Sequence, residues 1–184
     1  MNTAVSIVAL VLASASCALS LAVATRVKKI LDPLTDNSVV SPSSFIEQGT
    51  PIPDVGVLRD TAGEEIELHH DQDEVWLLTF LSSTCGGCAA QLSAYKELVQ
   101  ERKIPMSRAV SVVTGEGAAA DAFAESVSAF SQVLRPQENL NALLTGLGVR
   151  GFPTFLMVTP TGEVKYSTSK VSMLEAAGKK LAGV

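Results

Sequence analysis

Residues 75–88 of this chain read VWLLTFLSSTCGGC, an apolar run that leads into two cysteines separated by two glycines. The apolar part, residues 75–81, has the length and near-continuous hydrophobicity of a strand covered on both faces in a parallel sheet. Residues 89–102 then show apolar side chains at helical spacing. The stretch therefore predicts a buried strand that leads into a helix, with both cysteines at the junction.

The two cysteines have the spacing of a reversible disulfide. Cys85 and Cys88 are three residues apart, so a helix that begins here places them on one face within bridging distance. Cys85 would lie at the helix N-terminus, where free N–H groups and the helix dipole favour a thiolate. Gly86 and Gly87 leave the outer sulfur open to a partner chain. We therefore predict a catalytic dithiol in which Cys85 is the nucleophile and Cys88 the resolving thiol.

Three other interpretations of the cysteine pair compete with this one. A zinc half-site has the same spacing, but Cys17 lies in the apolar N-terminus, and the side chains of the adjacent His69 and His70 would diverge in an extended segment. A structural disulfide across so short a loop would remove little unfolded-state entropy. Inert buried thiols are disfavoured by the flanking glycines and by the polar residues 82–84. We expect no metal and no other cofactor.

The N-terminus is a candidate membrane anchor. Residues 4–24 carry no charge, and about 21 helical residues span about 31 Å, enough for the hydrocarbon core of a bilayer. A signal peptide cleaved after Ala24 is the alternative, but the first three residues lack the usual basic region. The next residues are rich in Ser, Pro, Asp and Asn. We predict a transmembrane anchor over residues 1–30, a flexible linker over 31–48 and a folded domain over 49–184.

Two features of the sequence predict opposite orientations of the domain relative to the membrane. Arg26, Lys28 and Lys29 follow the apolar segment, and the positive-inside rule would place them in the cytoplasm. A membrane-tethered dithiol, however, makes most chemical sense where disulfides are made and broken. We therefore predict a single-pass protein of the cell membrane with an extracytoplasmic domain.

The remaining pattern predicts an α/β domain. Residues 55–58 and 66–68 flank a turn-like segment and suggest a hairpin ahead of the main fold. Later strands and helices are expected in alternation: strands at 109–113, 133–134, 154–158 and 163–167, an Ala-rich helix that includes 123–130, and helices at 140–147 and 171–181. The net charge of −5 argues against nucleic acid as a partner.

Two motifs together resemble a known family. The Cys-Gly-Gly-Cys segment after a buried strand, with residues 149–154 (VRGFPT) before a later strand, looks like the thioredoxin fold. The match covers roughly residues 49–184. The hairpin, a helix-strand insert and the anchor make the chain most similar to the TlpA/ResA-like membrane-tethered thioredoxins, including the methylamine-utilisation accessory proteins. This resemblance implies a central mixed sheet flanked by helices.

The resemblance also implies roles for residues around the dithiol. The Phe152–Pro153 bond is expected to be cis, with Pro153 against the dithiol and the Phe152 backbone pairing with an extended client. Thr84 would line the same substrate-binding site, and Gly151 would join the motif glycines in shaping the backbone. The expected partners are protein thiols and disulfides, and a membrane-embedded redox protein is the natural partner of a tethered dithiol because the dithiol must be recharged.

The chain departs from the family at several positions. Thr84 stands where an aromatic residue is common, and Gly87 where proline is common. Thr79 matches the buried carboxylate that assists proton transfer in thioredoxin, and Gln91 replaces a glutamate of some tethered relatives. No acid–base side chain is therefore expected beside the dithiol.

Two other functions remain open alongside a thiol-disulfide oxidoreductase. A peroxidase of the peroxiredoxin or redoxin type shares the fold and uses a reactive cysteine, although Ser82 is the nearest substitute for its usual motif. A non-enzymatic, membrane-tethered binding module could keep the fold and use the motif region as a docking surface. The sequence specifies neither the client nor the direction of electron flow.

Overall fold

A computed structural model describes residues 45–68 and 74–182 of the chain. Its elements follow in the order β1 (Val57–Arg59), β2 (Glu65–Glu67), β3 (Trp76–Ser82), α2 (Gly86–Glu101), the 3-10 turn η2 (Met106–Arg108), β4 (Ala109–Thr114), α3 (Ala118–Ser128), β5 (Gln132–Leu134), α4 (Leu140–Gly146), β6 (Thr154–Val158), β7 (Val164–Thr168) and α5 (Val171–Ala182).

Five strands form a mixed sheet in the order β5-β4-β3-β6-β7. The central strand β3 is parallel to β4 and antiparallel to β6, and β5 is parallel to β4. All seven residues of β3 are buried, as its apolar sequence predicts. Because β3, β4 and β5 are parallel, their C-termini lie at the same end of the sheet, where the cysteines follow β3.

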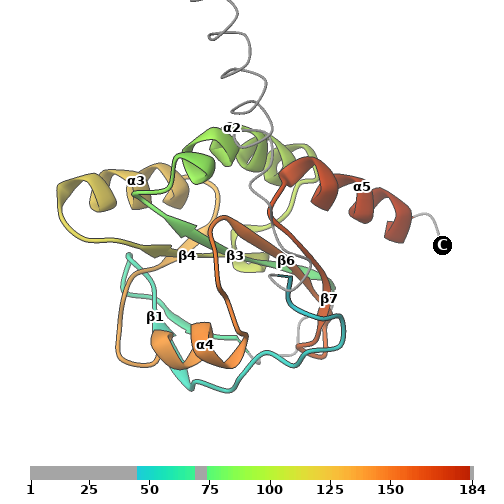
Figure 1. Ribbon diagram of the computed structural model, residues 1–184, viewed down its shortest axis with the longest axis horizontal. Helices are drawn as coiled ribbons and strands as arrows, with labels where there is room; N and C mark the ends of the chain where they lie inside the picture. The colour runs from blue at the N-terminus through green and yellow to red at the C-terminus, as the bar shows by residue number, and fades with distance from the viewer. Residues whose placement is uncertain (1–44, 69–73, 183–184) are drawn as a thin grey trace, which may run out of the picture. The chain divides into compact units, whose positions relative to one another are not determined.

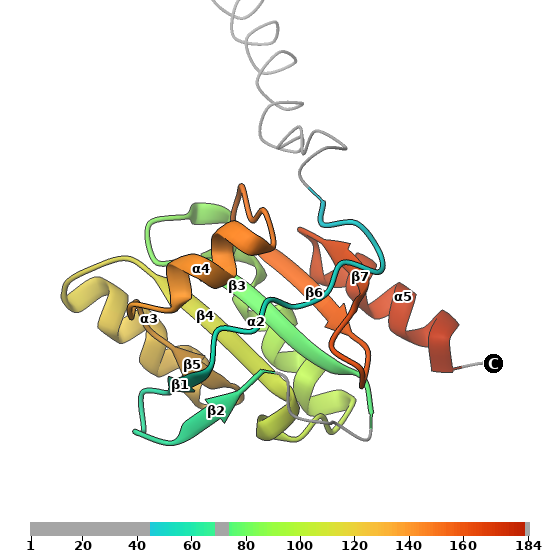
Figure 2. The ribbon, with the colours of Figure 1, turned by 90° about the horizontal axis from the view of Figure 1, so that it is seen from below.

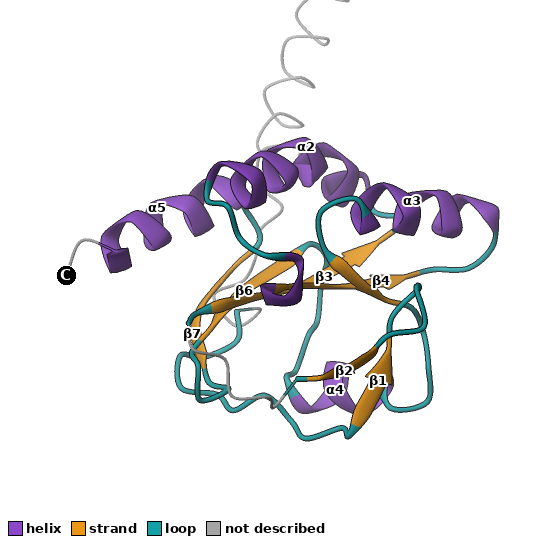
Figure 3. Cartoon of the chain, turned by 180° about the vertical axis from the view of Figure 1, so that it is seen from behind, coloured by secondary structure: helices purple, strands orange, loops and turns teal. Residues whose placement is uncertain are grey.

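Both faces of the sheet are covered. Helices α2, α3 and α5 lie along one face, whereas α4 and the β1–β2 hairpin lie along the other (Figures 1 and 3). Side chains of β3 alternate between the two layers: Leu78 and Phe80 enter the core beneath α4, and Leu77 and Leu81 enter the core beneath the three helices. The two cores explain why β3 is apolar at almost every position.

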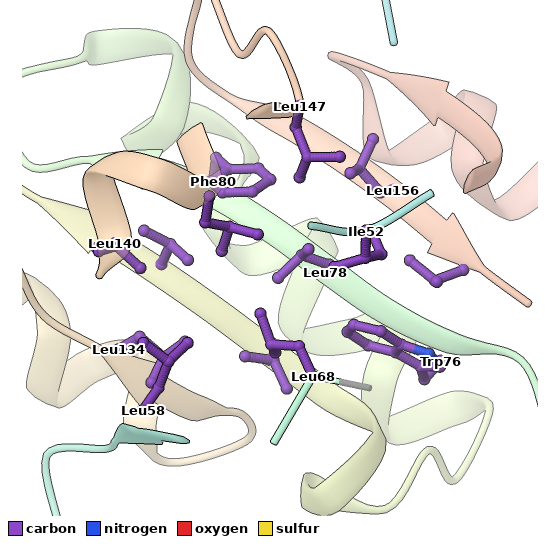
Figure 4. Packing of buried hydrophobic residues seen from close by; sticks show 14 of the residues in the cluster. Ile52, Leu58, Leu68, Trp76, Leu78, Phe80, Leu134, Leu140, Leu147 and Leu156 are labelled. Carbon is purple, nitrogen blue, oxygen red and sulfur yellow. The ribbon is translucent and has the colours of Figure 1, made fainter. Parts of the chain in front are cut away.

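The layer beneath α4 unites segments that are distant in the sequence. Figure 4 shows Ile52, Leu58, Leu134 and Leu140 in one layer of buried side chains over β3, with Ile52 beside Leu78 and Leu58 beside Leu134. All four are almost completely buried. The hairpin and α4 therefore close the sheet face seen in Figure 2.

The edges of the sheet are partly occupied by the N-terminal part of the domain. The turn of the hairpin pairs with β5 through a bridge between Asp60 and Leu134. The Gly49 N–H donates to the carbonyl of Val164, the first residue of β7, and the Ile52 N–H donates to the Gly162 carbonyl just before that strand. Ile46 is buried in the core, and its N–H donates to Ser167 Oγ at 3.2 Å. Ile46 is thus packed with the domain although it falls inside the linker predicted over residues 31–48, because its apolar side chain finds a buried site.

The structure confirms the predicted hairpin, with β1 and β2 antiparallel, and the predicted order of the later strands and helices. The predicted anchor over residues 1–30, with Cys17, Arg26, Lys28 and Lys29, lies outside the described residues. The described part of the chain contains no helix with both the length and the apolar character needed to cross a membrane.

Candidate active site

The dithiol is formed where β3 leads into α2. Cys85 is the N-cap residue of α2 and has an extended backbone, and the helix begins at Gly86. The Cys85 N–H donates to the Ser82 carbonyl at 3.1 Å, and the Cys88 N–H lies 3.3 Å from the Cys85 sulfur as a donor. Cys85 therefore caps its own helix through its side chain, at the position predicted from the sequence.

The two sulfurs have different environments. Cys85 is half-buried, whereas Cys88 is fully buried beneath the start of α2. The Cys88 sulfur accepts a hydrogen bond from the Ser82 N–H at 3.4 Å. Burial, which disfavours the charged thiolate, raises the pKa of Cys88 to about 12, and the neighbouring Cys85 adds to the increase. The outer sulfur is thus accessible and the inner one protected.

A second loop meets the dithiol from the start of β6. The Phe152–Pro153 peptide bond is cis, as the resemblance to the thioredoxin family implies. The Cys85 thiol donates to the Phe152 carbonyl oxygen at 3.3 Å. Pro153 is buried, but the Phe152 side chain is 37% exposed. The Thr154 hydroxyl donates to the Gly151 carbonyl at 2.8 Å and so closes the turn before β6.

Glycine forms much of the surface around Cys85. A methyl group built on Gly87 would lie 3.6 Å from both the Cys85 sulfur and Pro153 Cδ, so this residue borders the gap between them. Gly86 and Gly151 face open space. Thr84 is also exposed, and its hydroxyl lies 3.2 Å from that of Ser82. The structure therefore brings all eight predicted site residues together at one end of the sheet, where β3 ends and β6 begins.

A third loop, between β4 and α3, supports the segment before Cys85. The Ser83 N–H donates to the Thr114 carbonyl at 3.1 Å. Gly115 has a φ of 115°, and a methyl group on it would lie only 2.2 Å from Ser83 Oγ. A glycine is thus required both by the backbone and by the approach of Ser83. The glycines at 115 and 117 are the only sequence signal for this contact.

Four buried hydroxyls lie in the core beneath α2. Thr79 donates to Tyr95 Oη at 3.1 Å, Tyr95 and Ser111 are 3.3 Å apart, and Ser111 and Ser131 are 2.7 Å apart. Ser131 donates to the Ala109 carbonyl at 2.7 Å. Since each hydroxyl has one proton, this last bond sets a single direction for the chain, from Thr79 to the carbonyl. Burial raises the pKa of Tyr95. Thr79, where thioredoxin has a carboxylate, thus belongs to a neutral network.

Gln91 has a different role from that of an acid or base. Its side-chain oxygen accepts a hydrogen bond from the Val171 N–H at 3.0 Å, across 80 positions of sequence. The contact joins the first turns of α2 to the N-terminus of α5, where backbone donors lack partners within the helix. Sequence reasoning identified Gln91 as unusual but could not assign this partner.

Solved structures of several bacterial redox proteins have a similar fold. The thioredoxin domain of a thiol-disulfide oxidoreductase from Bacteroides vulgatus aligns with a TM-score of 0.63 at 17% identity, over 73% of this chain and 97% of that one. A thiol:disulfide interchange protein from Bacteroides sp. aligns with a TM-score of 0.63 at 16% identity, over 76% and 92%. This chain has a thioredoxin-like fold.

A more distant thioredoxin-like neighbour is a secreted Mycobacterium tuberculosis disulfide oxidoreductase described as homologous to Escherichia coli DsbE. Its TM-score is 0.54 at 13% identity, over 66% of this chain and 92% of that one. No protein-family model matches the sequence, and no curated protein is significantly similar to it. At these identities, the thioredoxin-like neighbours establish the fold, and the chemistry has to be argued from the site.

Proposed function

We propose that this protein is a thiol-disulfide oxidoreductase that exchanges disulfides with protein clients through Cys85 and Cys88. One observation carries the proposal: an accessible cysteine caps a helix directly above a buried cysteine one turn later, beside a cis-proline loop. The open outer sulfur is suited to attack a client, and the protected inner sulfur is suited to attack only its neighbour.

In the reducing direction, the Cys85 thiolate attacks one sulfur of a client disulfide. The client S–S bond breaks, and the released client sulfur leaves with the electron pair and takes up a proton. Cys88 then attacks the Cys85 sulfur of the mixed disulfide, which releases the second client thiol and leaves a Cys85–Cys88 disulfide. The client gains two electrons, which a partner dithiol must restore to the enzyme. The reverse sequence oxidises a client dithiol.

The residues around the sulfur support a role in binding an extended client. The Phe152 carbonyl accepts a hydrogen bond from the Cys85 thiol in this structure. When Cys85 loses its proton, this carbonyl becomes free to accept a client N–H, as the family resemblance implies. Thr84 and the exposed Phe152 ring would contact client side chains, while Gly86, Gly87 and Gly151 admit the client backbone and Pro153 supports the loop.

We further propose that residues 1–30 anchor the protein in the cell membrane and that the domain works outside the cytoplasm. The uncharged segment over residues 4–24 supports the anchor, and the redox chemistry of the dithiol supports the location. A membrane-embedded partner that supplies or removes electrons fits such a tethered dithiol.

The test uses the full-length chain purified in a mild detergent. Equilibration with glutathione mixtures should yield one reversible Cys85–Cys88 disulfide, measured by mass spectrometry. The potential should lie near that of thioredoxin for a reductase, or well above it for an oxidase. Cys88→Ser should accumulate a mixed disulfide with a client, and Cys85→Ser should not. The absence of reversible interconversion in the wild-type chain would refute the proposal.

Peroxide consumption distinguishes the peroxidase alternative. If Cys85 is a peroxidatic cysteine, hydrogen peroxide should convert it to a sulfenic acid and sustain turnover with a thiol reductant. A binding module, by contrast, should retain client binding and biological activity in Cys85→Ser. We expect neither result.

A further inference from the structure

Arg135 directly follows β5, at the end of the sheet where β3 and β4 also have their C-termini. Its side chain is only 23% exposed. One guanidinium nitrogen donates to the Ala120 carbonyl and the other to the Gly115 carbonyl, both at 3.2 Å. The second nitrogen also contacts Asp121 at 3.1 Å. Arg135 thus joins β5 to the start of the loop between β4 and α3 and to the first turn of α3.

That loop is in direct contact with the segment that carries the nucleophile. The Thr114 carbonyl accepts the Ser83 N–H, and Gly115 leaves space that Ser83 Oγ fills. The Thr114 hydroxyl donates to the Leu81 carbonyl at 3.1 Å, which joins the ends of β3 and β4. A continuous series of contacts therefore runs from Arg135 through Gly115 and Ser83 to the turn before Cys85.

We infer that Arg135 is a positioning residue for the dithiol: its guanidinium fork holds the β4–α3 loop against Ser83 and so fixes where the Cys85 sulfur stands. The inference rests on the proposed function, because positioning matters only if Cys85 reacts. The contacts of Arg135 themselves do not depend on the exchange reaction. Arg135 touches neither cysteine in the described structure and acts only through the loop.

The geometry of the fork, and not its charge alone, should matter. Arginine presents several planar donors that can reach carbonyls lying in different directions, whereas lysine carries one compact ammonium group. Arg135→Lys therefore keeps the charge but loses most of the bridging contacts. The carboxylate of Asp121 is 72% exposed, so its ion pair with Arg135 is largely in solvent. Asp121→Asn is accordingly a matched control that leaves the carbonyl contacts in place.

The experiment compares wild type, Arg135→Ala, Arg135→Lys and Asp121→Asn in the full-length reduced protein. The first measurement is the rate of Cys85 alkylation by iodoacetamide as a function of pH, followed by peptide mass spectrometry. The second is the reduction potential of the dithiol in glutathione buffers. The third is the urea midpoint, which separates a local change from a general loss of stability. Alkylation does not require disulfide exchange, so it can be read even if the proposed function fails.

We expect both Arg135 variants to change the alkylation rate by roughly tenfold at a given pH and to shift its pH profile, because small displacements of a reacting group have large effects on rate. Asp121→Asn should match wild type. The inference is overturned if both Arg135 variants keep the wild-type profile and potential, or if Arg135→Lys behaves as wild type while Arg135→Ala does not. Failure of wild type to cycle its disulfide would instead refute the proposed function. Should Arg135→Ala not fold, Arg135→Lys decides.

Discussion

The thiol of Cys85 donates a hydrogen bond to the carbonyl oxygen of Phe152 at 3.3 Å, although 67 positions of sequence separate the two residues. This bond joins the start of α2 to the loop before β6, two elements that pack on or within the same sheet. Cys85, the cis-proline loop and the exposed Phe152 therefore lie at the same end of the sheet.

The different burial of the two sulfurs predicts selective alkylation. In the folded, reduced protein, we expect iodoacetamide to modify Cys85 at least about tenfold faster than Cys88, because the inner thiol is inaccessible and its high pKa keeps it protonated. Peptide mass spectrometry measures both rates. Unfolding in guanidinium is the control and should abolish the difference. Equal modification rates in the folded protein would contradict the structure.

Cys88 should also make the reduced protein less stable at alkaline pH. Its pKa rises from the ordinary 9.0 to about 12 in the folded state, so folded Cys88 keeps its proton at pH values where the unfolded chain has lost it. The contribution of Cys88 to the free energy of unfolding should therefore be fully present below about pH 9. It should be lost as the pH rises toward about 12, by up to about 1.4 kcal/mol per pH unit.

Urea unfolding under reducing conditions, from about pH 8 to about pH 10.5, measures this effect. Cys88→Ser is the reference because serine does not titrate in this window. The wild-type slope should be the steeper of the two. Parallel slopes would show that Cys88 titrates alike in the folded and unfolded states.

The Phe152 ring should contribute to client binding and little to the dithiol itself. Phe152→Ala keeps the backbone carbonyl that contacts Cys85 but removes the ring of a residue that is 37% exposed. We expect KM for a disulfide-containing protein substrate to rise about five- to thirtyfold, the equivalent of about 1–2 kcal/mol of lost contact, with a smaller effect on kcat.

Met106→Ala is the matched control for this change. Met106 is 48% exposed and precedes β4, so it lies at the opposite end of the sheet from the cysteines. Steady-state kinetics should separate the two variants. If the Phe152→Ala enzyme has the KM of wild type, the ring does not take part in client binding.

The Tyr95 hydroxyl should stabilise the domain measurably. Tyr95→Phe leaves the partners Thr79 and Ser111 short of one hydrogen bond each inside the core. We expect a loss of about 1–3 kcal/mol in the free energy of unfolding. Ser126→Ala removes an exposed helical hydroxyl, which donates to Phe123, and should change stability by less than about 0.5 kcal/mol. If the two variants have similar urea midpoints, the buried chain of hydroxyls is not a source of stability.

Several features of this protein could be predicted from the sequence because they depend on neighbouring residues. The apolar run of β3, the helical spacing after it and the three-residue separation of Cys85 and Cys88 are all local patterns. The resemblance carried by residues 149–154 then placed Phe152 and Pro153 beside the dithiol. These patterns determined the fold and the place of the two cysteines within it.

Only the tertiary structure decided which distant polar groups meet. The contact of Arg135 with Gly115, that of Gln91 with Val171 and the hydroxyl chain through Tyr95 each join residues from separate elements. No local sequence pattern predicts the partner of an arginine, a glutamine or a buried serine, because that partner depends on strand register and helix packing. The sequence by itself therefore determined the cysteine pair and the fold, while the folded chain decided which distant polar groups contact one another.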